Sequence, residues 1–398
     1  MPGRIEPLAI TAFSATSALG RGLPAHLDAL RLGKSGLTVN DFSAAPLACR
    51  IGRVGGVEAT HLPRQLAHWD CRNNRLAWLG LQQDGLLDAI AKLIARHGAT
   101  RVALVLGTST ASIGSTEDAY RRLDDGRFPE DLRRPEIHAP HSLAAFVAEA
   151  TGIAGPTLTI STACSSSAKV FASAERLMRI GMADAALVGG VDTLCDSVLF
   201  GFHSLQLVSP NGCRPFDVNR DGISIGEAAA FAVLERMQTA PAAPRLLGHG
   251  ESSDAFHMST PHPEARGARA ALDAALARAG IGANDVDYIN LHGTATPKND
   301  EVEAKLLPRF LQRTRASSTK GFTGHTLGAA GALEAVVALL AIERGMIPPN
   351  LGCIDPIPEA APWLALQPAQ QSIDIALSNS FGFGGNNACL VFGRGDAP

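Results

Sequence analysis

Short apolar runs without polar alternation are the feature of this sequence that most limits what it can fold into. Two of them, residues 102–107 and 185–190, contain no charged or hydroxyl side chain. Such strands are typical of sheets covered on both faces, because a strand with one solvated face alternates polar and apolar residues. Longer stretches with helical character, residues 142–150 and 165–180, alternate with them. The pattern predicts an α/β protein with buried sheets.

A proline- and alanine-rich linker, residues 238–244, is followed by a second series of the same kind. There we expect helices over residues 268–279 and 329–343, and strands over 286–291 and 373–378. We therefore divide the chain into an N-terminal half, 1–240, and a C-terminal half, 245–398. With 398 residues, of which 46% are hydrophobic, the chain is long enough for two packed halves.

Charge and cysteine usage restrict the classes of function. A formal net charge of −3 argues against a surface that coats nucleic acid. The seven cysteines are odd in number and have no CxxC pair, so we expect no disulfide framework and no zinc site, and a reducing cytoplasm fits best. The N-terminus has no secretion signal pattern, and no window approaches about 18 uncharged apolar residues. We therefore expect neither a secreted protein nor a membrane partner.

Two further patterns are discounted as cofactor or metal sites. The glycine-rich stretch 382–385 is not followed by the helix and acidic residue that a dinucleotide loop requires. His249, His257 and His262 lack the spacing of metal ligands, and no cysteine lies near them in sequence. We predict no metal and no bound cofactor.

Cys164 lies where the predicted strand Thr157–Ile160 runs into a helix that we expect to begin near Ser165. Small residues surround it, which allows a tight strand-to-helix turn and leaves room for a substrate. A thiol at a helix N-terminus should have a pKa below the free value of about 8.5, because the helix dipole favours the thiolate. Cys164 is therefore a candidate nucleophile. The alternative is a small buried side chain without a chemical role.

Two histidines are candidate partners of this thiol. His292 ends a predicted strand and precedes Gly293, and His325 follows Gly324 at what reads as a second strand end, before a helix that continues through Glu334. A lone histidine in such a loop can be merely structural. One cysteine at a helix start with two histidines at strand ends is more specific, because a thiolate needs partners that titrate near neutral pH.

Eight sequence blocks in a fixed order carry a family resemblance. They comprise residues 10–14, 107–109, 162–166, 213–222, 253–258, 292–300, Lys320 with 324–325, and 382–387. The chain resembles the elongating β-ketoacyl-acyl-carrier-protein synthases, the Cys-His-His condensing enzymes of fatty acid and polyketide assembly. The resemblance runs nearly end to end and implies a thiolase-like α/β fold: two similar halves in a five-layered α-β-α-β-α architecture.

The resemblance also implies the reaction. Cys164 would accept an acyl group from a carrier protein as a thioester, and the backbone N–H groups of Cys164 and Phe383 would bind the oxyanion. His292 and His325, as neutral donors, would then stabilise the enolate formed when malonyl-carrier loses carbon dioxide. The implied activity is that of an acyltransferase, a 3-oxoacyl-acyl-carrier-protein synthase.

Lys320 and Glu303 form a second tier of implied catalytic residues. The resemblance places Glu303 in a network with Lys320 that fixes the orientation and charge of the histidines. Glu303 belongs to a helix that we expect Asn299 or Asp300 to cap. The alternative for Glu303 is a solvated helix carboxylate.

The resemblance further implies substrate contacts. Thr294 and Thr296 would hydrogen-bond the phosphopantetheine arm of the carrier, although threonines in a glycine loop can be local caps. Phe383 would gate the acyl pocket. Thr110 or Ala111 would lie near the pocket floor, where small side chains suggest room for a long or unsaturated chain.

Acyl carrier protein is the implied partner, and five arginines are candidates to contact it: Arg64, Arg72, Arg75, Arg133 and Arg134. The resemblance also implies a dimer through the apolar strand Thr157–Ile160, with an identical chain or with a chain-length partner.

Two alternative functions stay open: an inactive chain-length subunit, which typically lacks the nucleophile, and a thiolase acting on coenzyme A esters, for which Cys389 would be the second cysteine. Ala295 and Asn386 depart from the residues usual in the family, and the Gly-Gly-Asn-Asn form is similar to ketosynthases of polyene-type pathways. The sequence leaves the acyl chain length and the pathway open.

Overall fold

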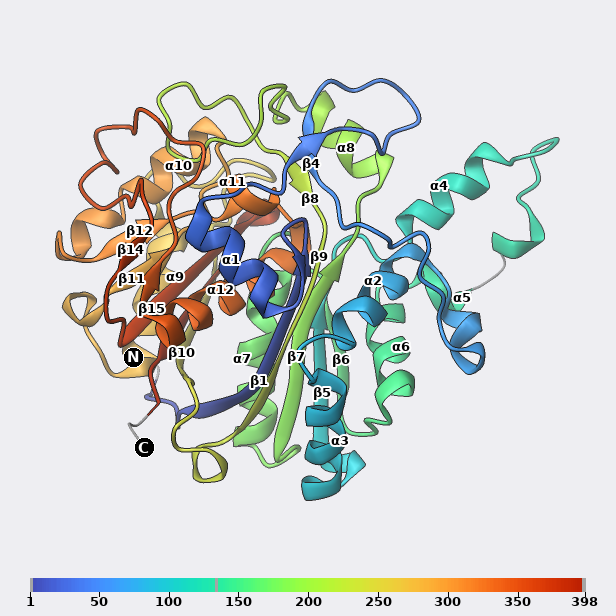
Figure 1. The fold of residues 1–398 in the computed structure, drawn as a ribbon, viewed down its shortest axis with the longest axis horizontal. Coiled ribbons are helices and arrows are strands. Elements are labelled where there is room, and N and C mark those ends of the chain that lie inside the picture. Colours follow the sequence, from blue (N-terminus) through green and yellow to red (C-terminus); the bar gives the residue numbers. More distant parts are fainter. Residues whose placement is uncertain (1–2, 133–134, 396–398) are drawn as a thin grey trace.

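The computed structural model describes residues 3–132 and 135–395, and a large mixed sheet runs through it (Figure 1). Its strand order is β12-β11-β15-β16-β10-β1-β9-β7-β5-β6. The bounds of the strands on this path are β1 Leu8–Ser17, β5 Val102–Gly107, β6 Thr157–Ile160, β7 Ala185–Asp192, β9 Ala228–Arg236, β10 Arg245–Ser253, β11 Tyr288–Asn290, β12 Arg315–Ser317, β15 Ile375–Gly382 and β16 Asn386–Gly393.

Strand pairing follows the same scheme twice. In the first half, β1, β9 and β7 are antiparallel, and β5 and β6 continue from β7 in parallel. In the second half, β10, β16 and β15 are antiparallel, and β11 and β12 continue in parallel. The two sets meet where β1 pairs with β10, with Leu8 opposite Leu246 and Ala9 opposite Arg245.

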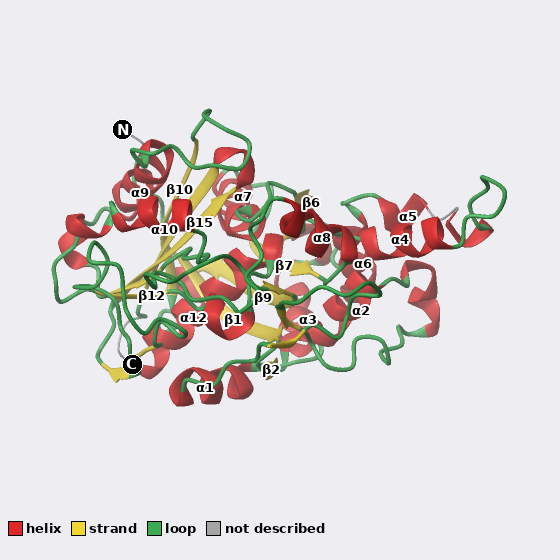
Figure 2. Ribbon diagram, turned by 90° about the horizontal axis from the view of Figure 1, so that it is seen from above, coloured by secondary structure: helices red, strands yellow, loops and turns green. Residues whose placement is uncertain are grey.

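Helices cover both faces of each strand set (Figures 1 and 2). α7 (Ser166–Arg179) and α12 (Ala330–Arg344) contact strands of both sets and form the central layer. α2 (Arg72–Leu81), α3 (Leu86–His97) and α6 (Ser142–Thr151) pack on the outer face of the first set, and α9 (Arg266–Ala279) packs on β10 and β16. The result is the expected α-β-α-β-α order of layers.

The remaining elements lie around these layers. They are β2 Gly20–Arg21, α1 Leu23–Leu32, β3 Thr38–Val39, β4 Arg50–Gly52, α4 Ile113–Arg121, α5 Pro135–His138, α8 Asp196–Ser204, β8 Ile225–Gly226, α10 Pro297–Ala304, α11 Lys320–Thr323, β13 Met346–Ile347, β14 Ala369–Gln370 and several short 3₁₀ segments. α4 and α5 project away from the sheet in Figure 2. Among the described residues, no helix is long and apolar enough to cross a membrane.

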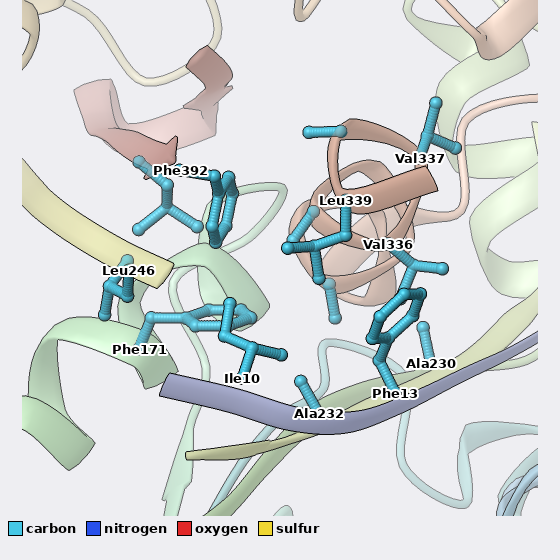
Figure 3. Close-up of a cluster of buried hydrophobic side chains, with 14 of the residues drawn as sticks. Ile10, Phe13, Phe171, Ala230, Ala232, Leu246, Val336, Val337, Leu339 and Phe392 are labelled. Atoms are coloured by element: carbon cyan, nitrogen blue, oxygen red, sulfur yellow. The ribbon is translucent and has the colours of Figure 1, made fainter. Parts of the chain in front are cut away.

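The central layer holds the main hydrophobic core (Figure 3). Phe171 of α7 and Phe392 of β16 meet edge to face with ring centroids 5.8 Å apart, while Phe13 of β1 lies beside Val336 of α12. Residues 330–342 of α12 are all buried, and apart from Glu334 they are apolar around the whole circumference of the helix.

Glycines let the first turn of α7 lie very close to its neighbours. A Cβ added at Gly107 of β5 would lie 2.5 Å from the backbone nitrogen of Ser167, and one added at Gly190 of β7 would lie 2.4 Å from the Ser167 Cβ. From the other side, a Cβ at Gly331 of α12 would lie 2.5 Å from the nitrogen of Ala168. These contacts fix the start of α7, and with it the position of Cys164.

Two local expectations are wrong. α10 begins at Pro297 with Thr296 at its N-cap, so neither Asn299 nor Asp300 caps it; the Asp300 carboxylate instead accepts a hydrogen bond from the backbone N–H of Phe216, 2.7 Å away. His325 follows the short helix α11 rather than a strand, although it forms an isolated bridge with Ile225.

Candidate active site

A tight turn between β6 and α7 presents Cys164. Ala163 adopts a left-handed conformation with φ 53°, which is uncommon for a residue with a Cβ. The hydroxyl of Ser166 holds this turn from the helix side: it accepts a hydrogen bond from the backbone N–H of Thr162 at 2.8 Å and donates one to the carbonyl oxygen of Ala163 at 2.6 Å. The predicted strand-to-helix placement of Cys164 is therefore present, with the strain one residue before the sulfur.

Cys164 lines a cavity of about 410 Å³, a size that suits a substrate arm. Six of the ten residues that sequence reasoning assigned to the site line this cavity: Cys164, His292, His325, Thr294, Thr296 and Phe383. Phe202, Leu205, Leu207 and Ile223 give it an apolar side.

The two imidazoles converge on the sulfur. His325 Nε2 lies 2.9 Å from Cys164 Sγ, and the rings of His292 and His325 are nearly perpendicular with centroids 5.4 Å apart. Burial, reinforced by the nearby charge of Lys320, lowers the pKa of both histidines well below its usual value. Both are therefore neutral near pH 7, as their expected role requires.

The pKa of Cys164 differs from the expectation. Burial raises it to about 11, and this effect outweighs Lys320 and the backbone N–H groups of Phe383 and Cys164, which lower it. The prediction that the helix terminus brings the pKa below the free value is wrong, because the sulfur is almost completely removed from water. The thiol must lose its proton to a neighbour, and His325 is in contact with it.

Lys320 is fully buried beside the histidines and forms an ion pair with Glu334 of α12. Its Nζ also donates to the carbonyl oxygen of His292 at 2.5 Å and lies 3.4 Å from His292 Nδ1. An ammonium group can only donate, so this contact makes Nδ1 an acceptor and leaves the proton of neutral His292 on Nε2. Burial raises the pKa of Glu334 to about 6.

The carboxylate of Glu303 hydrogen-bonds the loop that carries His292. Its carboxylate accepts hydrogen bonds from the backbone N–H of His292 at 2.8 Å and of Gly293 at 2.7 Å, and from Asn379 Nδ2 at 3.1 Å. Burial raises its pKa to about 7. Glu303 and Lys320 thus both bind His292, one at its backbone N–H and the other at its carbonyl oxygen, while the alternative of a solvated carboxylate is wrong.

Glu334, the carboxylate that does pair with Lys320, was missed by sequence reasoning. A signal was available, because Glu334 is the charged residue within the otherwise apolar run 330–342. A carboxylate inside such a helix needs a buried partner.

The predicted substrate contacts fall into two groups. The hydroxyls of Thr294 and Thr296 are 2.8 Å apart, and Phe383 packs on Phe202 with ring centroids 5.4 Å apart. All four residues line the cavity. Thr110 and Ala111 are not among its lining residues, so their place at a pocket floor stays a prediction.

The arginines that are candidates to contact a carrier protein differ in whether they have partners within the protein. Arg72 binds the buried carboxylate of Glu227, with Nη2 2.7 Å from Oε1, and Arg75 forms two hydrogen bonds of 2.6 Å with Asp70. Both arginines are engaged inside the protein, whereas Arg64 is exposed. Arg133 and Arg134 lie outside the described residues.

Among the described residues, one group has the geometry of metal ligands: Cys164, His292 and His325. One potential ligand atom each of Cys164, His292 and His325 lies within 4.8 Å of the others. A dication here would face the ammonium group of Lys320, which disfavours it. The expectation of no metal stays a prediction.

Comparisons with known proteins agree with this site. The family model described as "Beta-ketoacyl synthase, N-terminal domain" matches residues 5–240, and the model described as "Beta-ketoacyl synthase, C-terminal domain" matches residues 244–353. The chain therefore belongs to the β-ketoacyl synthase family, whose members are condensing acyltransferases, and the resemblance read from the sequence is confirmed.

Individual relatives cover most of the chain. It is 32% identical over 414 residues to 3-oxoacyl-[acyl-carrier-protein] synthase 2 of Synechocystis, covering 96% of this chain and 97% of the relative. It is 35% identical over 306 residues to Nodulation protein E of Rhizobium meliloti, covering 74% and 76%.

Solved structures confirm the fold. A ketosynthase in complex with its chain length factor from Xenorhabdus doucetiae has a TM-score of 0.87 and 37% identity, with 98% of both chains covered. A β-ketoacyl synthase from Burkholderia phymatum has a TM-score of 0.87 and 27% identity, with 98% of this chain and 100% of the other covered. The thiolase-like fold expected from the resemblance is confirmed.

Proposed function

We propose that the chain is an active β-ketoacyl-acyl-carrier-protein synthase that uses Cys164 as its nucleophile. The observation that carries this proposal is the 2.9 Å contact between Cys164 Sγ and His325 Nε2, inside a cavity that His292 also lines. A thiol, two neutral imidazoles and a buried lysine provide the groups that acyl transfer and decarboxylation need.

In the first half-reaction, Cys164 Sγ attacks the thioester carbonyl of an acyl-carrier. Its proton passes to His325 Nε2 and then to the departing carrier thiol. The carbonyl oxygen becomes negative in the tetrahedral intermediate, and the N–H groups of Cys164 and Phe383 bind it there. Both N–H groups already act on the sulfur, whose pKa they lower.

In the second half-reaction, malonyl-carrier loses carbon dioxide and its thioester carbonyl becomes an enolate. His292 Nε2–H donates to that oxygen, and so does His325 after its proton moves from Nδ1 to Nε2 once the carrier thiol has left. Lys320 keeps the His292 proton on Nε2 through its contact with Nδ1. The enolate carbon attacks the Cys164 thioester and releases the thiolate, which takes up a proton from water, so the 3-oxoacyl product stays on the carrier.

The alternatives fit the site less well. A chain-length subunit that lacks the nucleophile would not need the buried set of Cys164, two histidines and Lys320. A thiolase would need a second reactive cysteine, but Cys389 is fully buried in β16 and does not line the cavity, and burial raises its pKa.

We further propose that the chain acts in the cytoplasm without a metal or bound cofactor, on substrates carried by the phosphopantetheine arm of acyl carrier protein. All seven cysteines are free, which supports a reducing compartment. The related ketosynthase that was solved with its chain length factor supports a dimer with an identical chain or with a chain-length partner. The Gly-Gly-Asn-Asn loop supports a polyene-type polyketide pathway over general fatty acid synthesis.

Reconstituted condensation tests the proposal. The purified protein is incubated with acyl-carrier and malonyl-carrier proteins of several chain lengths, and the 3-oxoacyl product is read by mass on the carrier. The wild type and Cys389→Ala should form product, while Cys164→Ala should not. Product formation by Cys164→Ala, or its loss in Cys389→Ala alone, would contradict the assignment. Metal analysis of the active protein should find less than one ion per chain.

A further inference from the structure

Asp192, at the end of β7, is a fully buried carboxylate surrounded by hydrogen-bond donors. It accepts from the hydroxyl of Thr108 at 2.6 Å, the backbone N–H and hydroxyl of Ser109 at 2.8 and 2.6 Å, and the backbone N–H and hydroxyl of Thr110 at 2.9 and 2.8 Å. A sixth donor is the backbone N–H of Gly328, 2.6 Å from Oδ2. No cation appears among these contacts, so neutral donors alone stabilise its charge.

These contacts join the loop after β5 to the segment that follows His325. The hydroxyl of Ser109 strengthens the connection, because it donates to Asp192 and accepts from the Gly328 N–H at 3.2 Å. The approach is close: a Cβ added at Gly328 would lie 2.7 Å from Asp192 Oδ2. The carboxylate therefore holds Gly328 at hydrogen-bonding distance and leaves no room there for a side chain.

Between His325 and Gly328 the backbone is strained, because Leu327 has φ 56°. A leucine stays in this left-handed conformation only when its surroundings impose it. On the other side, two backbone hydrogen bonds fix His325. Its N–H donates to the carbonyl oxygen of Ser224 at 2.7 Å, and its carbonyl oxygen accepts from the N–H of Gly226 at 2.9 Å. The His325 turn is thus held at two ends, by β8 and by Asp192.

The ring of His325 has little else to orient it. Its Nδ1 is buried without a hydrogen-bond partner among the described residues, and its Nε2 faces Cys164. Its other ring contact is the nearly perpendicular imidazole of His292, so the direction of Nε2 depends strongly on where the backbone places the ring. We propose that Asp192 is a positioning residue, which acts through Gly328 and the strained turn at Leu327 to hold His325 against the Cys164 sulfur. This inference relies on the proposed function only in taking His325 as a partner of Cys164.

Asp192→Asn tests the inference in the full-length protein. The carboxamide keeps the volume but turns an NH₂ group toward either the Gly328 N–H or the 108–110 donors, so one end of the connection is lost. The readout is the rate at which iodoacetamide alkylates Cys164, followed by peptide mass across pH 6 to 10. Asp217→Asn is the matched control, because Asp217 is also buried and accepts three backbone hydrogen bonds, from Asn219, Ile354 and Asp355, away from His325.

A double-mutant cycle separates positioning from general support of the fold. Asp192→Asn should change the alkylation rate roughly tenfold or more and shift the pH profile in the same direction as His325→Ala, since a misplacement of about 1 Å at a site can cost about 10²-fold. In the His325→Ala background it should have no further effect. Equal effects in both backgrounds, or an effect matched by Asp217→Asn, would overturn the inference.

A milder variant covers the case in which Asp192→Asn does not fold. Ser109→Ala removes the hydroxyl that connects Asp192 with Gly328 and should give a smaller shift of the same sign, again absent without His325. An unchanged profile in folded Ser109→Ala and Asp192→Asn proteins would also overturn the inference. Because alkylation requires no carrier substrate, a failed condensation assay contradicts the proposed function without affecting this result.

Discussion

Burial determines the charge states of three side chains that share one site, Cys164, His292 and His325. Removal from water raises the pKa of the thiol to about 11 and lowers that of both imidazoles. The resting site is thus a neutral thiol beside neutral bases, and Lys320 with Glu334 supplies a buried ion pair next to it. Proton transfer from Cys164 to His325 therefore has to accompany the attack on the substrate.

The two histidines should have different effects on the two half-reactions. His325 contacts the sulfur at 2.9 Å, whereas His292 is positioned by Lys320 and Glu303. We expect His292→Ala to lose malonyl decarboxylation by about 10²- to 10³-fold while keeping most acylation of Cys164, and His325→Ala to impair both steps. Carbon dioxide release and the acyl adduct on Cys164 measure the two steps separately. Equal losses of both steps in both variants would show that the roles are divided wrongly.

Glu303 predicts a specific pH dependence of stability. Its pKa is raised from 4.5 to about 7 in the folded protein, so the folded state binds this proton more tightly than the unfolded chain does. The resulting stabilisation is fully present below about pH 4.5 and is lost as the pH rises through about 7. The melting temperature of the wild type, relative to that of Glu303→Gln, should therefore decrease as the pH rises from about 4.5 to about 7. The exposed Glu301→Gln serves as control, and parallel curves for wild type and Glu303→Gln would contradict the account.

At the scale of elements, the start of α7 is the part of the fold that the chemistry depends on. Gly331→Ala would place a Cβ 2.5 Å from the backbone of Ala168, and neither side can yield, because residues 330–342 of α12 are all buried. We expect a loss of about 1–3 kcal/mol in unfolding free energy and slower alkylation of Cys164. Denaturant titration measures the first effect. Gly201→Ala in α8, where an added Cβ meets nothing within 4 Å, should be harmless.

The elements could largely be predicted from local patterns. The predicted strands Val102–Gly107 and Thr157–Ile160 coincide with β5 and β6, because fully buried and edge strands carry distinct apolar runs. α10 begins three or four residues earlier than expected, since Asp300 is attractive as a cap but accepts its hydrogen bond from the distant backbone of Phe216. Likewise the partner of Lys320 depends on how α12 packs, which no local pattern specifies.

At the scale of the whole molecule, β6 ends the sheet and leaves an edge. Its Leu158 side chain is 42% exposed although the strand is apolar, and unpaired edges of this kind are usually covered by another chain. We expect the active species to be a dimer through this strand, and Leu158→Lys to weaken it. Sedimentation should show a species heavier than 41.5 kDa for the wild type, and the monomer for the variant. Leu32→Lys, at an exposed position of α1, is the control; a fully active wild-type monomer would contradict the expectation.

The most direct test of the account is the mass of the acylated protein. After incubation with an acyl-carrier protein and no malonyl-carrier, the chain should gain the mass of one acyl group. Peptide mapping should place that group on Cys164, and later addition of malonyl-carrier should remove it as the 3-oxoacyl product forms. An acyl group on Cys389 or on any other residue, or an adduct on Cys164 that malonyl-carrier does not discharge, would contradict the central claim that Cys164 is the nucleophile of a condensing enzyme.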